Sequence, residues 1–204
     1  MSRHHPSETT LLAYAAGSLP APHVRVVAVH LASCPACAAD VRALEAAGGA
    51  LIGALPPAGL GTDALARLLD RLGEPAPRAV WTKAPVTLES LATGRWRWSG
   101  PGIAMMPLLK RDSSNTRLDL IRVSPGIGLL EHGHTGFETT VVLQGAFDDG
   151  LERYETGDFG EADAATDHCP TALPGPDCIC LIATSAHLRP HSLIGQLVRP
   201  LLGM

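Results

Sequence analysis

Three residues with the chemistry of metal ligands lie close together near the amino end of the chain. Cys34 follows His30 by four residues, and Cys37 follows after three more. Residues i and i+4 are neighbours on a helix, so His30 and Cys34 are predicted to share one helix face. Pro35 suits the first position of a new helix. Two thiolates and an imidazole at such a break match tetrahedral zinc, which needs one more ligand.

The fourth ligand of this first site is expected from the N-terminal pair His4 and His5. The sequence alone prefers His5 only slightly, and His23 is a more distant candidate. The competing interpretation is a buried pair of reduced cysteines with a histidine nearby by chance. The spacing favours the metal, because histidine and cysteine at such intervals are typical of zinc sites.

A second set of ligand types lies in the other half of the chain. His132, His134 and Glu138 share parity, so on an extended chain their side chains point to one face. His168 is expected to join them from a neighbouring strand. Three imidazoles and one carboxylate suit zinc, ferrous iron or nickel, so the residue types leave the metal open. The competing interpretation is a group of histidines on a surface turn.

Short helices are expected to position the first site. Apolar spacing and end signals predict helices over residues 7–16 and 22–32, a third beginning at Pro35, and a fourth over 62–72. The first three carry mostly small apolar residues and would be marginally stable alone. A zinc site, worth on the order of 10 kcal/mol of apparent folding free energy, would change that balance.

The fourth predicted helix has an apolar stripe that includes Leu65, Leu68 and Leu72. Such a stripe must be buried against something, because an exposed apolar face is unfavourable in water. The helical bundle of the same chain and a partner protein are equally good candidates to cover it. The sequence does not decide between them.

The hydrophobic pattern changes to period 2 from about residue 80. Segments such as 139–143 and 178–184 are rich in β-branched and apolar residues, and glycine and proline turns separate them. Many short strands with such turns predict a sandwich or a small barrel. We therefore expect an α+β multidomain chain with a helical domain over 1–73, a linker over 74–84 and a β domain over 85–204.

Composition narrows the possible functions. The chain has 204 residues, 46% of them hydrophobic, and a formal net charge of -4. This charge argues against direct binding of nucleic acid, which usually requires a basic face. Five cysteines, two of them in a metal spacing, indicate a reducing cytoplasmic compartment. The longest uncharged run, 46–62, is interrupted by glycine and proline, so no membrane span is expected.

The pattern Gly-x5-His-x-His-x3-Glu-x6-Gly over residues 126–145 resembles the first motif of the cupins, which fold as jelly-roll β-barrels. The second cupin motif is degraded. His168 is present, but the usual proline and glycine before it and the asparagine after it are not. The β domain is therefore expected to be a cupin-like barrel.

The chain as a whole resembles the ChrR-type zinc-dependent anti-sigma factors. The resemblance is carried by the segments 11–17, 142–147 and 177–181 together with both sets of metal-ligand residues. It implies two zinc ions per chain, with another divalent metal as the alternative in the second site. The implied ligands are His5, His30, Cys34 and Cys37 for the first site, and His132, His134, Glu138 and His168 for the second.

The resemblance also implies a function without enzymatic activity. The helical domain would bind an extracytoplasmic-function sigma factor and keep it from RNA polymerase core, with Leu65, Leu68 and Leu72 as candidate contacts. The cupin domain would sense an oxidant such as singlet oxygen or an organic hydroperoxide. The alternative is a cupin dioxygenase that uses ferrous iron in the second site, with the helices as a docking appendage.

Overall fold

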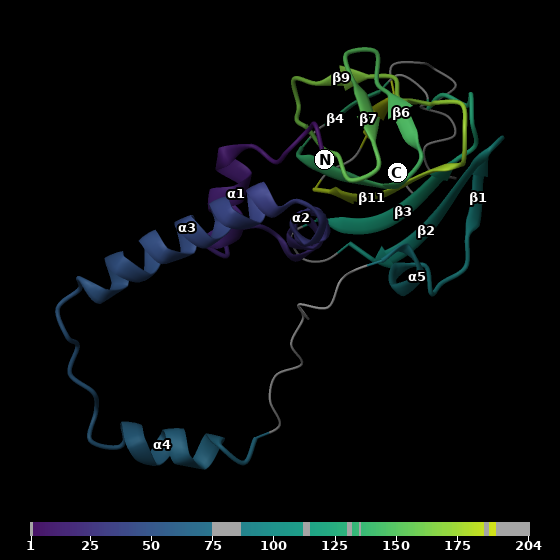
Figure 1. Ribbon diagram of the computed structural model, residues 1–204. Helices are drawn as coiled ribbons and strands as arrows, with labels where there is room; N and C mark the ends of the chain where they lie inside the picture. The colour runs from purple at the N-terminus through teal and green to yellow at the C-terminus, as the bar shows by residue number, and fades with distance from the viewer. Residues whose placement is uncertain are drawn as a thin grey trace.

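A computed structural model gives the arrangement of the chain (Figure 1). Of the predicted linker, only Glu74 is described, so most of that prediction lies outside the described residues. The predicted helices and the change to strands after residue 80 are both present. The structure describes residues 2–74, 87–111, 115–129, 132–134, 136–185 and 188–190.

Local chemistry explains where the helices begin and end. Ser7 caps the first helix, because its side chain accepts a hydrogen bond from the backbone N–H of Thr10 at 3.2 Å. Gly17 follows that helix with φ of 67°, a left-handed conformation that glycine adopts without strain. Pro35 begins the third helix, as predicted. The helices are α1 (Glu8–Ala15), α2 (Ala21–Ser33), α3 (Pro35–Gly53), α4 (Ala64–Arg71) and α5 (Leu88–Leu91).

In the part of the β half that the structure describes, the strands form one large antiparallel sheet and two small ones. The large sheet has six strands in the order β1-β2-β3-β11-β5-β8, and the small sheets have the orders β10-β6-β7 and β12-β4-β9. The strands are β1 (Arg97–Gly100), β2 (Ile103–Leu109), β3 (Arg117–Val123), β4 (His132–His134), β5 (Glu138–Gln144), β6 (Ala146–Asp148), β7 (Arg153–Glu155), β8 (Phe159–Ala162), β9 (Asp167–His168), β10 (Thr171–Ala172), β11 (Cys178–Thr184) and β12 (Leu188–Pro190).

The two faces of the large sheet bury different sets of residues. On the central strand β11, Ile179, Leu181 and Ala183 belong to one buried cluster, whereas Cys178 and Cys180 belong to another. This division follows from the strand geometry, because successive side chains point to opposite faces. One face therefore packs on the helices, and the other faces the interior of the β domain.

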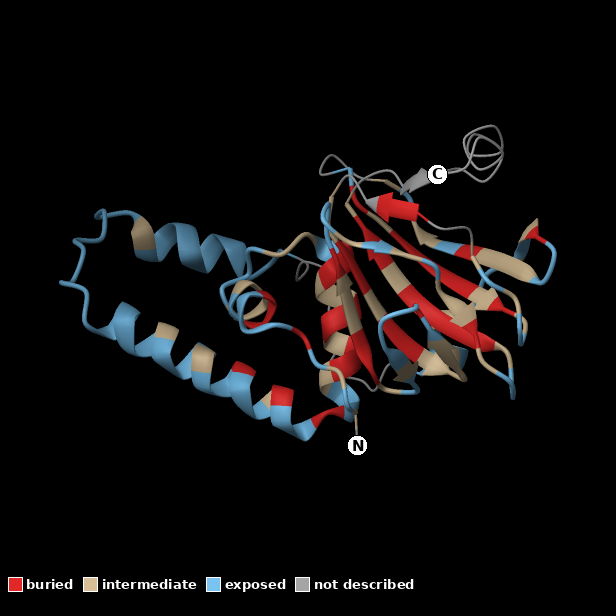
Figure 2. Ribbon diagram, turned by 90° about the horizontal axis from the view of Figure 1, so that it is seen from above, coloured by how far each residue is buried: buried red, intermediate tan, exposed pale blue. Residues whose placement is uncertain are grey.

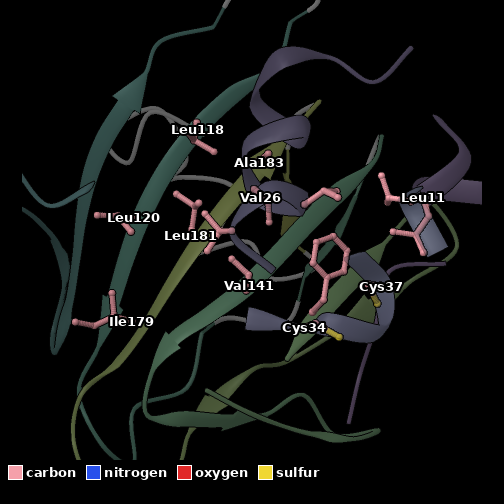
Figure 3. Close-up of a cluster of buried hydrophobic side chains, with 14 of the residues drawn as sticks. Leu11, Val26, Cys34, Cys37, Leu118, Leu120, Val141, Ile179, Leu181 and Ala183 are labelled. Carbon is pink, nitrogen blue, oxygen red and sulfur yellow. The ribbon is translucent and has the colours of Figure 1, made fainter. Parts of the chain in front are cut away.

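The helices and the large sheet share one hydrophobic core. Val26 and Val27 of α2 are fully buried in the same cluster as Leu120, Val141 and Leu181 of the sheet. Figure 3 shows Val26 among these strand residues, with Cys34 and Cys37 at the edge of the cluster. The β domain thus buries the small apolar residues of the helical region. This packing stabilises the helices in addition to any metal site.

The second half of α3 and the whole of α4 extend away from this core (Figures 1 and 2). Helix α4 has no buried residue. The side chains of Leu65, Leu68 and Leu72 are 66%, 59% and 74% exposed. Of the two candidates for covering this stripe, the helical bundle of the same chain does not cover it among the residues that the structure describes.

Helices α2 and α3 meet at a sharp corner. They are bent by 119° relative to each other across a break at Cys34. Within the described residues, no helix is by itself long and apolar enough to cross a membrane. The bent pair of α2 and α3 passes that test only when the two are taken together, by length and composition.

Candidate metal sites

Four metal-ligand side chains converge at the corner between α2 and α3. The ligand atoms of His5, His30, Cys34 and Cys37 all lie within 4.8 Å of one another. The Nδ1 atom of His5 is 3.5 Å from the sulfur of Cys34 and 3.3 Å from the sulfur of Cys37. The corner thus brings the two sulfurs together, and the N-terminal arm adds the second imidazole.

The tautomer of His30 suits a metal ligand. Its Nδ1 lies 2.9 Å from the carbonyl oxygen of Gly157, which accepts hydrogen bonds but donates none, so Nδ1 carries the proton. The other nitrogen, Nε2, is buried without a hydrogen-bond partner in the described residues. A buried orphan nitrogen with a free lone pair is costly unless it binds something. A backbone carbonyl that accepts from one ring nitrogen and so orients the other is typical of metal-bound histidine.

The cysteine pair also fits a cation. Both thiols are buried and free of disulfide bonds. Without an ion, burial and the neighbouring Cys34 thiol raise the pKa of Cys37 to about 12. A bound zinc ion would reverse this, because it stabilises the thiolates that it coordinates. Two thiolates and two neutral imidazoles form a complete tetrahedral donor set for structural zinc.

The N-terminal arm separates the roles of His4 and His5. His4 turns away from the cysteines, because its Nδ1 is 2.9 Å from a carboxylate oxygen of Glu152 and its Nε2 is 3.0 Å from the carbonyl oxygen of Arg153. The buried carboxylate of Asp158 accepts hydrogen bonds from the backbone N–H groups of Arg3 and His4. These contacts hold the arm on the β domain and leave His5 facing the cluster.

The supporting roles of Gly157 and Asp158 were not predictable from the sequence. The only signal was the turn composition of residues 154–158, which gives no information about contacts with the helical region. Gly157 has φ of 96°, a conformation that glycine tolerates, and its carbonyl faces His30. The first site is therefore built by both halves of the chain.

His23 links α2 to the β domain and takes no part in the four-residue cluster. It is fully buried, with Nδ1 2.9 Å from the Thr139 hydroxyl and Nε2 2.7 Å from the Ser185 hydroxyl. The Ser185 hydroxyl donates to the carbonyl oxygen of Phe137 at 3.1 Å. Its oxygen therefore accepts from the Nε2–H of His23, and Nδ1 accepts from Thr139. We call these three residues the His23 clasp.

The His23 clasp predicts loss of stability in mild acid. Burial lowers the pKa of His23 to about 4, whereas the unfolded chain binds this proton near pH 6.5. His23 therefore makes its full contribution to the free energy of unfolding above pH 6.5. As the pH drops toward 4, protonation of His23 in the unfolded chain removes about 3 kcal/mol of this stability. Urea unfolding at pH 7 and pH 5 measures the effect.

The control for this prediction is His23→Gln, which keeps hydrogen-bonding groups but cannot take up a proton. Acid also weakens zinc binding by protonating its ligands, so the relevant quantity is the difference between the two proteins. The variant should be less stable at pH 7 and lose less stability between pH 7 and 5. An equal loss in both proteins would show that His23 does not contribute.

The second predicted site is partly assembled in the described residues. The Nε2 atoms of His132 and His168 lie 3.1 Å apart across the β4–β9 pair. Two nitrogens bound to one zinc at about 2.0 Å in a tetrahedral site would be about 3.3 Å apart. Burial and the neighbouring His132 lower the pKa of His168 to about 4, so its imidazole is neutral at pH 7. This pair therefore fits a shared cation.

The structure describes the other two predicted ligands of the second site, Glu138 and His134, to different extents. Glu138 is buried, and its carboxylate accepts a hydrogen bond from the Thr184 hydroxyl at 3.3 Å. Burial raises its pKa to about 7, a shift that a nearby cation would oppose. Within the described residues, Glu138 does not form with the two imidazoles a group as close as the first cluster. The backbone of His134 lies in β4, and its side chain is outside the described part.

Comparisons with protein families define the class of this protein. Residues 9–38 match the family described as "Putative zinc-finger", and residues 86–187 match the family described as "ChrR Cupin-like domain". The fold and the first cluster agree with both descriptions. The chain thus combines an N-terminal helical region that matches a zinc-finger family with a C-terminal cupin-like domain.

A curated relative identifies the family. The chain is 40% identical over 208 residues, 97% of each protein, to the Anti-sigma-E factor ChrR of Cereibacter sphaeroides. A likeness of this degree and extent shows common ancestry, and the chain belongs to the ChrR anti-sigma factor family.

One solved structure supports the same family. The crystal structure of Rhodobacter sphaeroides SigE in complex with the anti-sigma ChrR matches with 39% identity and a TM-score of 0.76, over 90% of this chain and 99% of that chain. An acetylacetone dioxygenase from Acinetobacter johnsonii matches with 13% identity and a TM-score of 0.43, over 47% of this chain and 68% of that chain. A likeness as distant as the second says nothing about activity.

Proposed function

We propose that this protein binds an extracytoplasmic-function sigma factor in the cytoplasm, holds it inactive and releases it under oxidative stress. The observation that carries the proposal is the likeness over nearly the whole chain to an anti-sigma factor that was crystallised with its sigma factor. The cupin-like domain would be the sensor of singlet oxygen or an organic hydroperoxide, and no enzymatic step is required of it.

The exposed stripe of α4 supports a partner-binding role. Leu65 and Leu68 lie on α4 together with Leu69, which is 55% exposed, and Leu72 is the C-cap residue of that helix. Exposed apolar clusters of this kind are typical of protein interaction sites. An amphipathic helix laid in an apolar groove is a common mode of recognition. We assign these leucines to the sigma contact.

Each half of the chain has a metal site in this proposal. Zinc bound by His5, His30, Cys34 and Cys37 would fix the corner between α2 and α3 within a helical domain over 1–73. A second zinc, or another divalent metal, would be held by His132, His134, Glu138 and His168 in a cupin domain over 85–204, with 74–84 as the linker. In both sites a bound ion would hold its ligand side chains in fixed positions and add positive charge.

The His23 clasp offers a physical link between the two halves. Thr139 follows Glu138, and Ser185 follows Thr184, whose hydroxyl is bonded to Glu138. His23 holds both Thr139 and Ser185 and lies on the same helix as His30. A change in the position of Glu138 would therefore act on the ends of β5 and β11 that hold α2. This is the route we propose from sensor to sigma-binding helices.

Reconstitution tests the proposed function. The purified zinc-loaded chain should form a stable complex with an extracytoplasmic-function sigma factor of its own organism, and should inhibit transcription from that factor's promoter. An oxidant added to the complex should restore transcription. If the chain binds no extracytoplasmic-function sigma factor of its own organism, the proposal is wrong. If it binds but the oxidant has no effect, only the sensing role is wrong.

Metal content tests the second site separately. We expect two zinc ions per chain in the intact protein and one in a Glu138→Ala variant, because the carboxylate is one of four proposed ligands. Glu89→Gln, on an exposed helix, should keep both ions. Elemental analysis gives the count. One iron per chain together with oxygen uptake would instead favour the dioxygenase alternative, and one zinc in the intact protein would contradict the second site.

A further inference from the structure

The inner face of the large sheet lines a cavity of about 710 Å³. This face is formed by the inward-pointing residues of β3, β5 and β11, opposite the face that packs on α2. Pockets that hold small molecules have volumes of about 300–1,000 Å³. The walls of the cavity are mainly apolar and include Ile103, Met105, Ile121, Ile127, Phe147 and Ile182.

The cavity opens to solvent beside Trp98. This side chain belongs to the cavity lining and is 77% exposed, so it marks the rim. The buried His132 and Glu138, with the half-buried His168, also line the cavity. A molecule that enters would therefore have both apolar walls and a polar region to contact.

The charges that face the cavity select against an anionic ligand. Arg117 is the one arginine or lysine among the described lining residues, and its Nε lies 2.8 Å from a carboxylate oxygen of Asp119. The other charged groups of the lining, Glu138, Asp149 and Glu161, are all acidic. Three carboxylates outweigh the two positive charges of a divalent cation, so the described lining has no net positive charge even with the second metal site filled. A buried carboxylate or phosphate without an opposite charge is strongly disfavoured.

We propose that this cavity binds an uncharged small molecule with a hydrocarbon chain of medium length and a small polar head, such as a medium-chain alcohol, ketone or ester. The hydrocarbon chain would replace water along walls that offer it few hydrogen bonds. The head would lie toward the imidazoles of His132 and His168. The proposal concerns a ligand of the cupin-like domain and does not depend on sigma binding.

A displacement assay tests the proposal on the full-length, zinc-loaded protein without any partner. The probe is N-phenyl-1-naphthylamine, an uncharged fluorophore whose emission rises in apolar surroundings. We expect saturable binding with one probe per chain. Decanol should displace the probe at a concentration at least ten-fold lower than decanoate. Absence of saturable binding would overturn the proposal, and equal or better displacement by decanoate would overturn the uncharged head.

Variants locate the bound probe. Ile121→Trp and Ala172→Phe fill the cavity from two different strands and should weaken probe binding at least ten-fold, whereas Ile121→Val should preserve it. Circular dichroism and metal content show whether each variant is folded. The probe has another apolar target in the exposed leucines of α4, so the triple variant Leu65→Gln, Leu68→Gln, Leu72→Gln is the matched control. Binding that survives both filled variants and disappears in the α4 variant would contradict the proposal.

Discussion

Removal of zinc from the first site should abolish sigma binding and unfold the corner between α2 and α3. The expected loss is on the order of 10 kcal/mol of apparent stability in that region, because structural zinc contributes free energies of this size. Part of this loss is the Nε2 of His30, which would remain buried without a partner. Cys37→Ser should have the same effect as a chelator, because a serine hydroxyl is a poor zinc ligand at neutral pH.

The measurements are zinc per chain, far-ultraviolet circular dichroism and affinity for the sigma factor. Cys169→Ser is the matched control, because Cys169 is an exposed free cysteine outside the cluster. It should keep its zinc, its helix content and its binding. A metal-free protein that keeps its helices and binds sigma as tightly as before would show that this cluster is not a structural zinc site.

Replacement of the leucines on and at the end of α4 should strongly weaken binding of the sigma factor while the free protein stays as stable as before. Leu65, Leu68 and Leu72 are each more than half exposed, so polar residues there cost the free chain little. Glutamine has nearly the helix propensity of leucine, so α4 should persist in a Leu65→Gln, Leu68→Gln, Leu72→Gln variant. Burial of the three leucines in a complex is worth about 1–2 kcal/mol each. We expect affinity to fall about 100-fold or more.

Calorimetric titration of the sigma factor gives the affinity, and urea unfolding gives the stability of the free variant. Leu151→Gln is the matched control, because Leu151 is a leucine of the β half that is 76% exposed. It should leave the affinity unchanged. Unchanged affinity in the triple variant would show that the sigma factor is held elsewhere, and lower stability of the free variant would show that α4 packs within this chain.

Features that depend on near neighbours were predictable from the sequence. The Ser7 cap and the helix start at Pro35 follow from the chemistry of a few adjacent residues. The meeting of His30, Cys34 and Cys37 follows from helix geometry and one break in the chain. The change from period 3.6 to period 2 separated helices from strands, because each pattern buries one face of its own element.

The tertiary structure decided what lies far apart in sequence. His5 faces the cluster and His4 does not, because Asp158, more than 150 residues away, holds the arm in place. His30 takes its tautomer from Gly157, 127 residues later, and His23 bonds to Thr139, 116 residues later. Spacing along the chain carries no information about such contacts. They form only when the helical region packs on the β domain and the polar groups of both are buried together.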